Sequence, residues 1–215
     1  MAPIPASALN PVIDNLWEIF CKKQTLTAFE CKRYEREAQK AIKIEPEISH
    51  FIHILLAAIT GNSIEAIRLI EQSRIIGMSS VLSANIVSTC VFLGKMRLAY
   101  DIACEAFERF PDSRAISELA ADLAEAFDDS AMLETIFVQW SILFPDSVHP
   151  LLEEAAQLRA IESLQEEMEK YPENSEEYCK AEERFLDALT QGMSVLEPSF
   201  ATQRIEALLQ EHDNI

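Results

Sequence analysis

Glycine is scarce in this 215-residue sequence, which has only Gly61, Gly77, Gly94 and Gly192. Tight β-hairpin turns and phosphate-binding loops both rely on glycine, because it adopts backbone conformations that other residues avoid. The sequence contains no phosphate loop, no dinucleotide-binding fingerprint, and neither the GxSxG nor the HExxH catalytic motif. Ala, Leu, Ile and Glu are abundant instead. We therefore expect helices with almost no β-strand, and no enzymatic activity.

Positive charge is also scarce, since the sequence has 36 acidic residues but only 18 lysines and arginines, which gives a formal net charge of -18. A protein that binds nucleic-acid phosphates needs an excess of Lys and Arg, so we expect no such direct contact. The imbalance is local: residues 1–104 carry 10 acidic and 11 basic side chains, whereas residues 105–187 carry 22 and 6. This distribution fits either a solvated acidic surface or a surface that attracts a basic partner.

Paired cysteines and long apolar runs are missing as well. The five cysteines are odd in number, widely spaced and without a CxxC pair, which is typical of a reducing compartment. The most apolar stretch, residues 51–59, is too short to span a bilayer, and the N-terminal residues lack the charged region of a secretory signal. We therefore expect a soluble, cytoplasmic protein without membrane insertion.

The nearest approach to a metal site is Glu47, His50 and His53, which share one predicted helix at intervals of three residues. A Glu-x-x-His half of a di-iron site requires a matching half elsewhere, and the sequence has none. Pairs of carboxylates are so common here that they single out no general acid or base. The sequence predicts no metal and no cofactor.

A four-residue segment recurs at a distance of 34 residues, because residues 110–113 and 144–147 both read FPDS. Helix-ending residues follow the same period at about residues 46, 77, 111 and 145, with intermediate turns near residues 61, 94 and 128. Apolar residues between the turns follow helical spacing, so each period predicts two helices. Side-chain oxygens that could cap these helices come from Asn62 or Ser63, Ser79 or Ser80, Asp112 or Ser113, Ser130, and Asp146 or Ser147.

Residues 94–111, GKMRLAYDIACEAFERFP, resemble the tetratricopeptide repeat family. Gly94 stands at the turn between helices, Ala99 and Ala106 at the two small packing positions, and Pro111 at the end of the repeat. The other repeats match at fewer positions, which are Ala41 and Pro46, Gly61 and Ala66, and Pro145. The resemblance covers about residues 13–147.

The resemblance implies an all-α protein built as a right-handed α-solenoid of about four helical hairpins over residues 13–147. Residues 1–12 would form an N-terminal tail and residues 148–215 an acidic C-terminal helical extension. Within the extension we expect helices at about 150–171, 174–190 and 199–212, the last of which would cap the array or contact a partner. Trp140 occupies a position that is small in the family, so it should distort the fourth repeat or end regular stacking.

In tetratricopeptide arrays the first helix of each hairpin lines a concave face. Carried onto this sequence, that geometry predicts a partner-binding groove formed by Ile48, Phe51, Leu55, Val81, Ala84, Ser88, Val91, Glu118, Asp122 and Glu125. The groove would be apolar in the second repeat, small in the third and acidic in the fourth, which suits an amphipathic, partly basic protein segment. The alternative is that Phe51 and Leu55 belong to the core and that the carboxylates are simply solvated.

The leading hypothesis is a non-enzymatic scaffold or chaperone that holds such a segment of a partner protein in its concave groove. Bacterial type III secretion chaperones of the tetratricopeptide class are the nearest analogy. One alternative is an immunity or antitoxin protein that neutralises a basic toxin, and another is an acidic DNA mimic. The last predicted helix is also a candidate contact for a homodimer.

Overall fold

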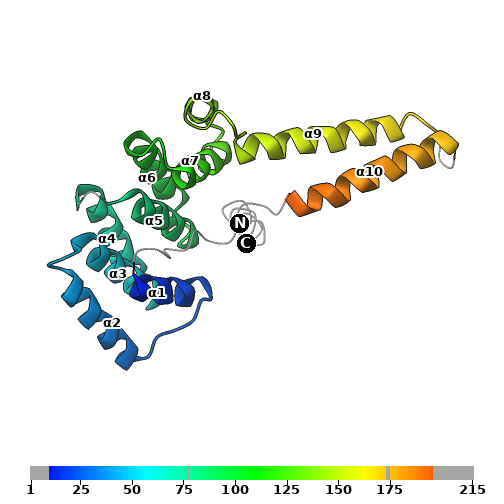
Figure 1. Cartoon of the computed structure of the whole chain (residues 1–215). Coiled ribbons are helices and arrows are strands. Elements are labelled where there is room, and N and C mark those ends of the chain that lie inside the picture. The colour runs from blue at the N-terminus through cyan, green and yellow to red at the C-terminus, as the bar shows by residue number, and fades with distance from the viewer. Residues whose placement is uncertain (1–9, 77, 173–174, 196–215) are drawn as a thin grey trace.

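The computed structural model describes residues 10–76, 78–172 and 175–195, and these residues form ten α-helices with no β-strand. The helices are α1 (Pro11–Cys21), α2 (Ala28–Ala41), α3 (Pro46–Ile59), α4 (Ser63–Ile76), α5 (Ser80–Phe92), α6 (Met96–Arg109), α7 (Arg114–Ala126), α8 (Ser130–Leu143), α9 (Pro150–Met168) and α10 (Glu176–Val195). Figure 1 shows α1 to α8 as a stack of short helices from which the longer α9 and α10 project. The predicted all-helical class is confirmed.

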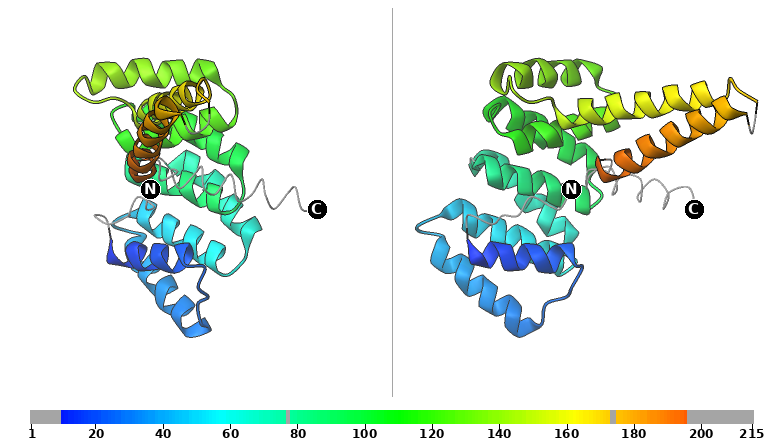
Figure 2. Two further views of the ribbon diagram at one scale, coloured as in Figure 1. Left: turned by 90° about the vertical axis from the view of Figure 1, so that its right-hand side faces the viewer. Right: turned by 45° about the vertical axis from the view of Figure 1, so that its right-hand side comes forward.

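The odd-numbered helices form one continuous row, here called the inner row. In this row α1 packs on α3, α3 on α5, α5 on α7, and α7 on α9. The even-numbered helices α4, α6, α8 and α10 each pair with the odd-numbered helix that precedes them. Successive helical hairpins are therefore stacked side by side, as the solenoid prediction requires (Figure 2).

The turns within the pairs α3–α4, α5–α6 and α7–α8 share one backbone conformation. Gly61, Gly94 and Asp128 all have positive φ, at 77°, 68° and 54°, and they lie 33 and 34 residues apart. At the second of these turns the Gly94 amide donates to the Val91 carbonyl at 2.9 Å, and corresponding bonds close the other two turns. Lys23, with φ of 51°, ends α1 in the same way. The periodic turn predicted at residues 61, 94 and 128 is thus a repeated left-handed C-cap.

The two FPDS segments also have the same structure. In each copy the phenylalanine amide closes the preceding helix by donating to the carbonyl four residues earlier, at 2.8 Å for Phe110 and 2.7 Å for Phe144. The serine amide then donates to the carbonyl of that phenylalanine at 3.0 Å in both copies. Proline follows directly because it cannot continue a helix, so the sequence repeat encodes a repeated helix stop.

Two of the predicted helix caps are correct. Asn62 Oδ1 accepts a hydrogen bond from the Glu65 amide at 3.2 Å at the start of α4. Ser79 Oγ accepts one from the Leu82 amide at 3.5 Å at the start of α5. Each side chain satisfies one of the amides that lack a partner in the first turn of a helix.

Two other caps fall on different residues from those predicted. Asp129, not Ser130, caps α8 and accepts a hydrogen bond from the Met132 amide at 3.0 Å. His149 caps α9 in place of Asp146 or Ser147. Ser113 stands at the N-cap of α7, as predicted, but its side chain makes no capping hydrogen bond. Several polar side chains stand near each of these helix starts, so tertiary packing decides which of them caps.

The junction between α8 and α9 is built from aromatic rings. The His149 imidazole lies edge-on to Trp140, with ring centroids 4.6 Å apart, and Trp140 Nε1 donates to the Ser147 carbonyl at 3.1 Å. Burial lowers the pKa of His149 to about 4, so the ring is neutral near pH 7 and its Nδ1 accepts from the Leu151 amide at 3.2 Å. α9 packs on α7 but has no comparable contact with α8, whereas α6 does pack on α7. In the described part of the chain α4 and α5 likewise make no such contact, so these contacts do not test the distortion predicted at Trp140.

The C-terminal extension follows the predicted order with shifted bounds. α9 ends at Met168, three residues before the predicted end, and α10 continues through Gly192 to Val195. α10 packs mainly on α9, and Arg184 joins the two helices through an ion pair with Glu167 at 2.8 Å. The helix predicted at residues 199–212 lies outside the described residues. At the other end, α1 begins at Pro11, slightly before the predicted boundary at residue 13.

The small residues of α6 provide a test of the packing. Ala99 is fully buried in the helix that lies between α5 and α7. We predict that Ala99→Leu lowers the free energy of unfolding by about 1–3 kcal/mol, because added methylene groups overpack a close helix crossing. Ala160→Leu, at an exposed position within α9, is the control and should change stability little. Urea unfolding followed by circular dichroism measures both, and equal effects would contradict the role assigned to Ala99.

Candidate partner-binding surface

Most of the predicted groove residues lie inside the protein. Six of the ten have buried side chains: Ile48, Phe51, Leu55, Ala84, Ser88 and Val91. They belong to the interior because α3 and α5, which carry them, each have neighbours in the inner row on both sides as well as a paired outer helix. These six residues therefore do not line an open groove in this structure, and for Phe51 and Leu55 the core alternative is correct.

Helix α1 covers the apolar end of the predicted groove. The Trp17 ring lies 6.3 Å from the Phe51 ring of α3 and 6.3 Å from the Phe92 ring of α5, measured between centroids. Phe20 also meets Phe92, at 5.1 Å. We call Phe51 and Phe92 the aromatic seat of α1. Trp17 and Phe20 were not predicted to cover the groove, although their apolar spacing on one short helix is a signal of burial.

The other four predicted residues remain accessible to different degrees. Val81 is 38 % exposed, Glu118 and Asp122 are half-buried, and Glu125 is exposed. The three carboxylates stand at positions i, i+4 and i+7 of α7, so they share one face of that helix. The accessible part of the predicted groove is consequently its acidic end.

A fourth carboxylate from the next inner helix belongs to the same surface. Glu154 of α9 raises the pKa of Glu125, in addition to the larger effect of partial burial. Both effects disfavour the ionised form, because burial removes hydration and a nearby carboxylate repels a second one. We call Glu118, Asp122, Glu125 and Glu154 the acidic edge. Glu154 was not among the predicted groove residues, because only the packing of α9 on α7 brings it to this surface.

Arg114 opposes the effect of burial on Glu118 only in part. Burial raises the pKa of Glu118, and the charge of Arg114 opposes this shift with a smaller effect. The Arg114 guanidinium lies over the rings of α8 and its C-cap, 4.7 Å from the Phe144 centroid and 5.6 Å from that of Trp140. The cation is thus held over aromatic faces while its charge also acts on Glu118.

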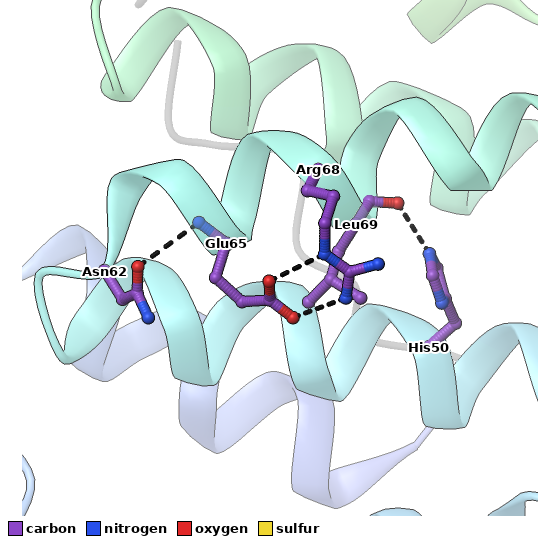
Figure 3. A network of polar contacts seen from close by, with 5 residues as sticks. All are labelled: His50, Asn62, Glu65, Arg68 and Leu69. Atoms are coloured by element: carbon purple, nitrogen blue, oxygen red, sulfur yellow. Dashed lines mark hydrogen bonds and ion pairs between the residues drawn. The ribbon is translucent and has the colours of Figure 1, made fainter.

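The three residues considered for a metal site have separate structural roles. His50 Nε2 lies 2.7 Å from the Leu69 carbonyl of α4, beside the Glu65–Arg68 ion pair (Figure 3). Glu47 accepts a hydrogen bond from the Ser79 amide at 3.1 Å, which ties α3 to the start of α5. His53 faces a cleft instead. Within the described ranges, no group of three or more His, Cys, Asp and Glu residues could hold a metal ion.

A cleft of about 670 Å³ lies between α2, α3 and α4. Its lining carries cations from Lys32 and Arg36 together with carboxylates from Glu35 and Glu65, and Leu56 contributes apolar surface. This mixture of charges does not favour one class of ligand. None of the predicted groove residues lines the cleft.

Comparison with known proteins does not add a family or a relative. Neither a scan against protein-family models nor a search of curated proteins finds a match. None of the helices in the described part of the chain combines the length and hydrophobicity that crossing a membrane requires.

The raised pKa of Glu118 gives a prediction about pH. A carboxyl whose pKa is higher in the folded than in the unfolded protein destabilises the fold when ionised, and this cost appears as pH rises above the unfolded value of about 4.3. We predict that Glu118→Gln is more stable than the original protein at pH 7, and that the difference shrinks below about pH 4. Urea unfolding at both pH values tests this, with Glu162→Gln on the exposed side of α9 as the control. A difference independent of pH would mean that the charge of Glu118 is not its cause.

Proposed function

We propose that this protein is a non-enzymatic, tetratricopeptide-like scaffold or chaperone that binds a basic segment of a partner protein along the acidic edge. The observation that carries the proposal is the acidic edge itself, in which three carboxylates share one face of α7 and Glu154 of α9 contributes to raising the pKa of Glu125. A stacked array of helical hairpins supports the proposal because such arrays offer extended surfaces for binding other proteins.

The chemistry of the acidic edge favours lysine and arginine side chains from the partner. A cation placed beside Glu125 would offset the repulsion from Glu154 and would favour the ionised form of Glu125. Binding would therefore relieve a cost that the free protein carries. Surface charges of one sign also accelerate encounter with an oppositely charged partner, so association should be fast at low salt and slower at high salt.

The proposed partner segment is a short amphipathic helix or extended chain with several basic residues. Val81 on α5 is a partly exposed apolar contact on the helix that packs next to α7, so an apolar residue in the segment would have a place to dock. The deeply buried residues at the other end of the predicted groove are not part of this surface. The proposed site is consequently shorter and more acidic than the groove expected from sequence.

Charge reversal of the acidic edge tests the proposed function. We predict that Glu118→Lys, Asp122→Lys and Glu125→Lys together weaken binding of a fluorescein-labelled, lysine-rich amphipathic peptide of 18 residues by at least about tenfold, because attraction between carboxylates and peptide lysines is replaced by repulsion. A tenfold change corresponds to roughly 1.4 kcal/mol of binding free energy. Fluorescence anisotropy at 50 mM and 200 mM salt measures the affinity and its dependence on screening.

The matched control carries the same change in charge at a different place. Glu162, Glu166 and Glu169 have the same spacing on the exposed surface of α9, and changing all three to lysine alters the net charge equally. The control should retain most of the affinity. If both triple variants lose affinity to the same extent, the peptide responds to overall charge alone and the acidic edge is not a specific site.

A further inference from the structure

Helix α1 joins the inner row differently from the other odd-numbered helices. α3, α5, α7 and α9 each pair with the helix that follows them, but α1 and α2 both pack on α3 and have no comparable contact with each other. Residues 22–25 of the connection between α1 and α2 are exposed. α1 is therefore held mainly by its contacts with α3 and with Phe92, and not by a hairpin partner.

The contact surface of α1 is apolar and has a regular helical pattern. Ile13, Leu16, Trp17 and Phe20 stand at positions i, i+3, i+4 and i+7, and the first three are buried. Such spacing gives a continuous stripe on one side of a helix. The aromatic seat thus already holds an amphipathic helix, and that helix shows what kind of ligand fits.

The docked position of α1 also carries costs. Trp17 Nε1 and Asp14 Oδ1 are buried without a hydrogen-bond partner, although both atoms are hydrogen-bonded to water when exposed. In addition α1 has only 11 residues, and isolated helices of that length are marginal in water. Release of α1 would hydrate both polar atoms and would leave the pairs α3–α4 and α5–α6 in place.

We propose that α1 is a displaceable helix and that the aromatic seat beneath it binds an amphipathic helix of a partner protein. The partner helix carries apolar residues at i, i+3, i+4 and i+7 with aromatic rings at the last two positions, as α1 does. The partner helix differs from α1 in one respect. It either supplies a hydrogen-bond acceptor for the indole N–H of its tryptophan or has phenylalanine in place of that tryptophan. The proposal rests on the protein-binding function proposed above but adds a second surface, separate from the acidic edge.

A peptide with the sequence of α1 is the direct probe. Residues 10–21 as a fluorescein-labelled peptide, with Cys21→Ser to prevent oxidation, carry two acidic and no basic side chains, so the acidic edge does not attract them. We expect the full-length variant Trp17→Ala with Phe20→Ala to bind this peptide at least about tenfold more tightly than the unchanged protein, as measured by anisotropy. The α1 helix of the double variant then competes less well with the peptide for the aromatic seat.

Two controls isolate the seat. Phe29→Ala, which removes an aromatic ring 77 % exposed on α2, should leave peptide binding unchanged. A peptide with alanine at positions 17 and 20 should not bind either protein. Equal affinity of the double variant and the unchanged protein for the original peptide would overturn the proposal. Because the probe is acidic, that failure would leave the acidic edge untouched.

Hydrogen exchange of the unchanged protein supplies a second measurement that needs no variant. Amides of α1 should exchange at least about tenfold faster than the slowest amides of α3 and α5, because α1 opens without unfolding of the array. If the amides of α1 are as slow as those of α3 and α5, the helix opens only with global unfolding and the proposal is wrong. This result also decides the matter if the double variant fails to fold.

Discussion

Close contact between successive inner helices is the constraint on which the rest of the structure depends. It is most demanding at α5, where every residue from Leu82 to Val91 is buried although the helix contains Ser, Asn and Thr. Ser88 and Thr89 donate to carbonyls of their own helix at 3.1 and 2.7 Å, and Asn85 Nδ2 donates to the Val81 carbonyl at 2.9 Å. These donors are satisfied within their own helix and require no partner across the interface, so neighbouring helices can approach closely, and only Asn85 Oδ1 among the atoms of these three side chains is left buried without a partner.

The sequence predicted those features that local chemistry controls. Gly61, Gly94 and Pro111 mark helix ends because their backbone preferences act at their own positions, and the structure has turns there. Asp128 adopts the same left-handed conformation without being glycine, and the repeat period was needed to place it. The position of α1 was not predictable in this way. Contact between Trp17 and Phe92 joins residues 75 positions apart, and no local pattern specifies it.

The dependence on contacts between residues distant in the sequence also explains why most of the predicted groove residues are buried. Family geometry assigned equivalent roles to Phe51, Ser88 and Glu118 because these residues hold related positions on successive inner helices. Their surroundings differ: Phe51 lies against Trp17 of α1, Ser88 is buried in the central helix, and Glu118 is only half-buried on α7. Periodicity establishes which side of a helix a residue occupies. Whether that side is covered depends on helices distant in the sequence, and therefore on the assembled fold.

The attachment of the α9–α10 pair has a consequence for variation in length. The two helices pack mainly on each other, and α9 meets the array at α7, close to where His149 seals the junction against Trp140. Their distal turns lie far from the stacked hairpins (Figure 1). Paired insertions or deletions of whole helical turns at that distal end would preserve both the register of the pair and the junction. The arm is thus a part of the architecture that evolution, or an engineer, can lengthen without rebuilding the array.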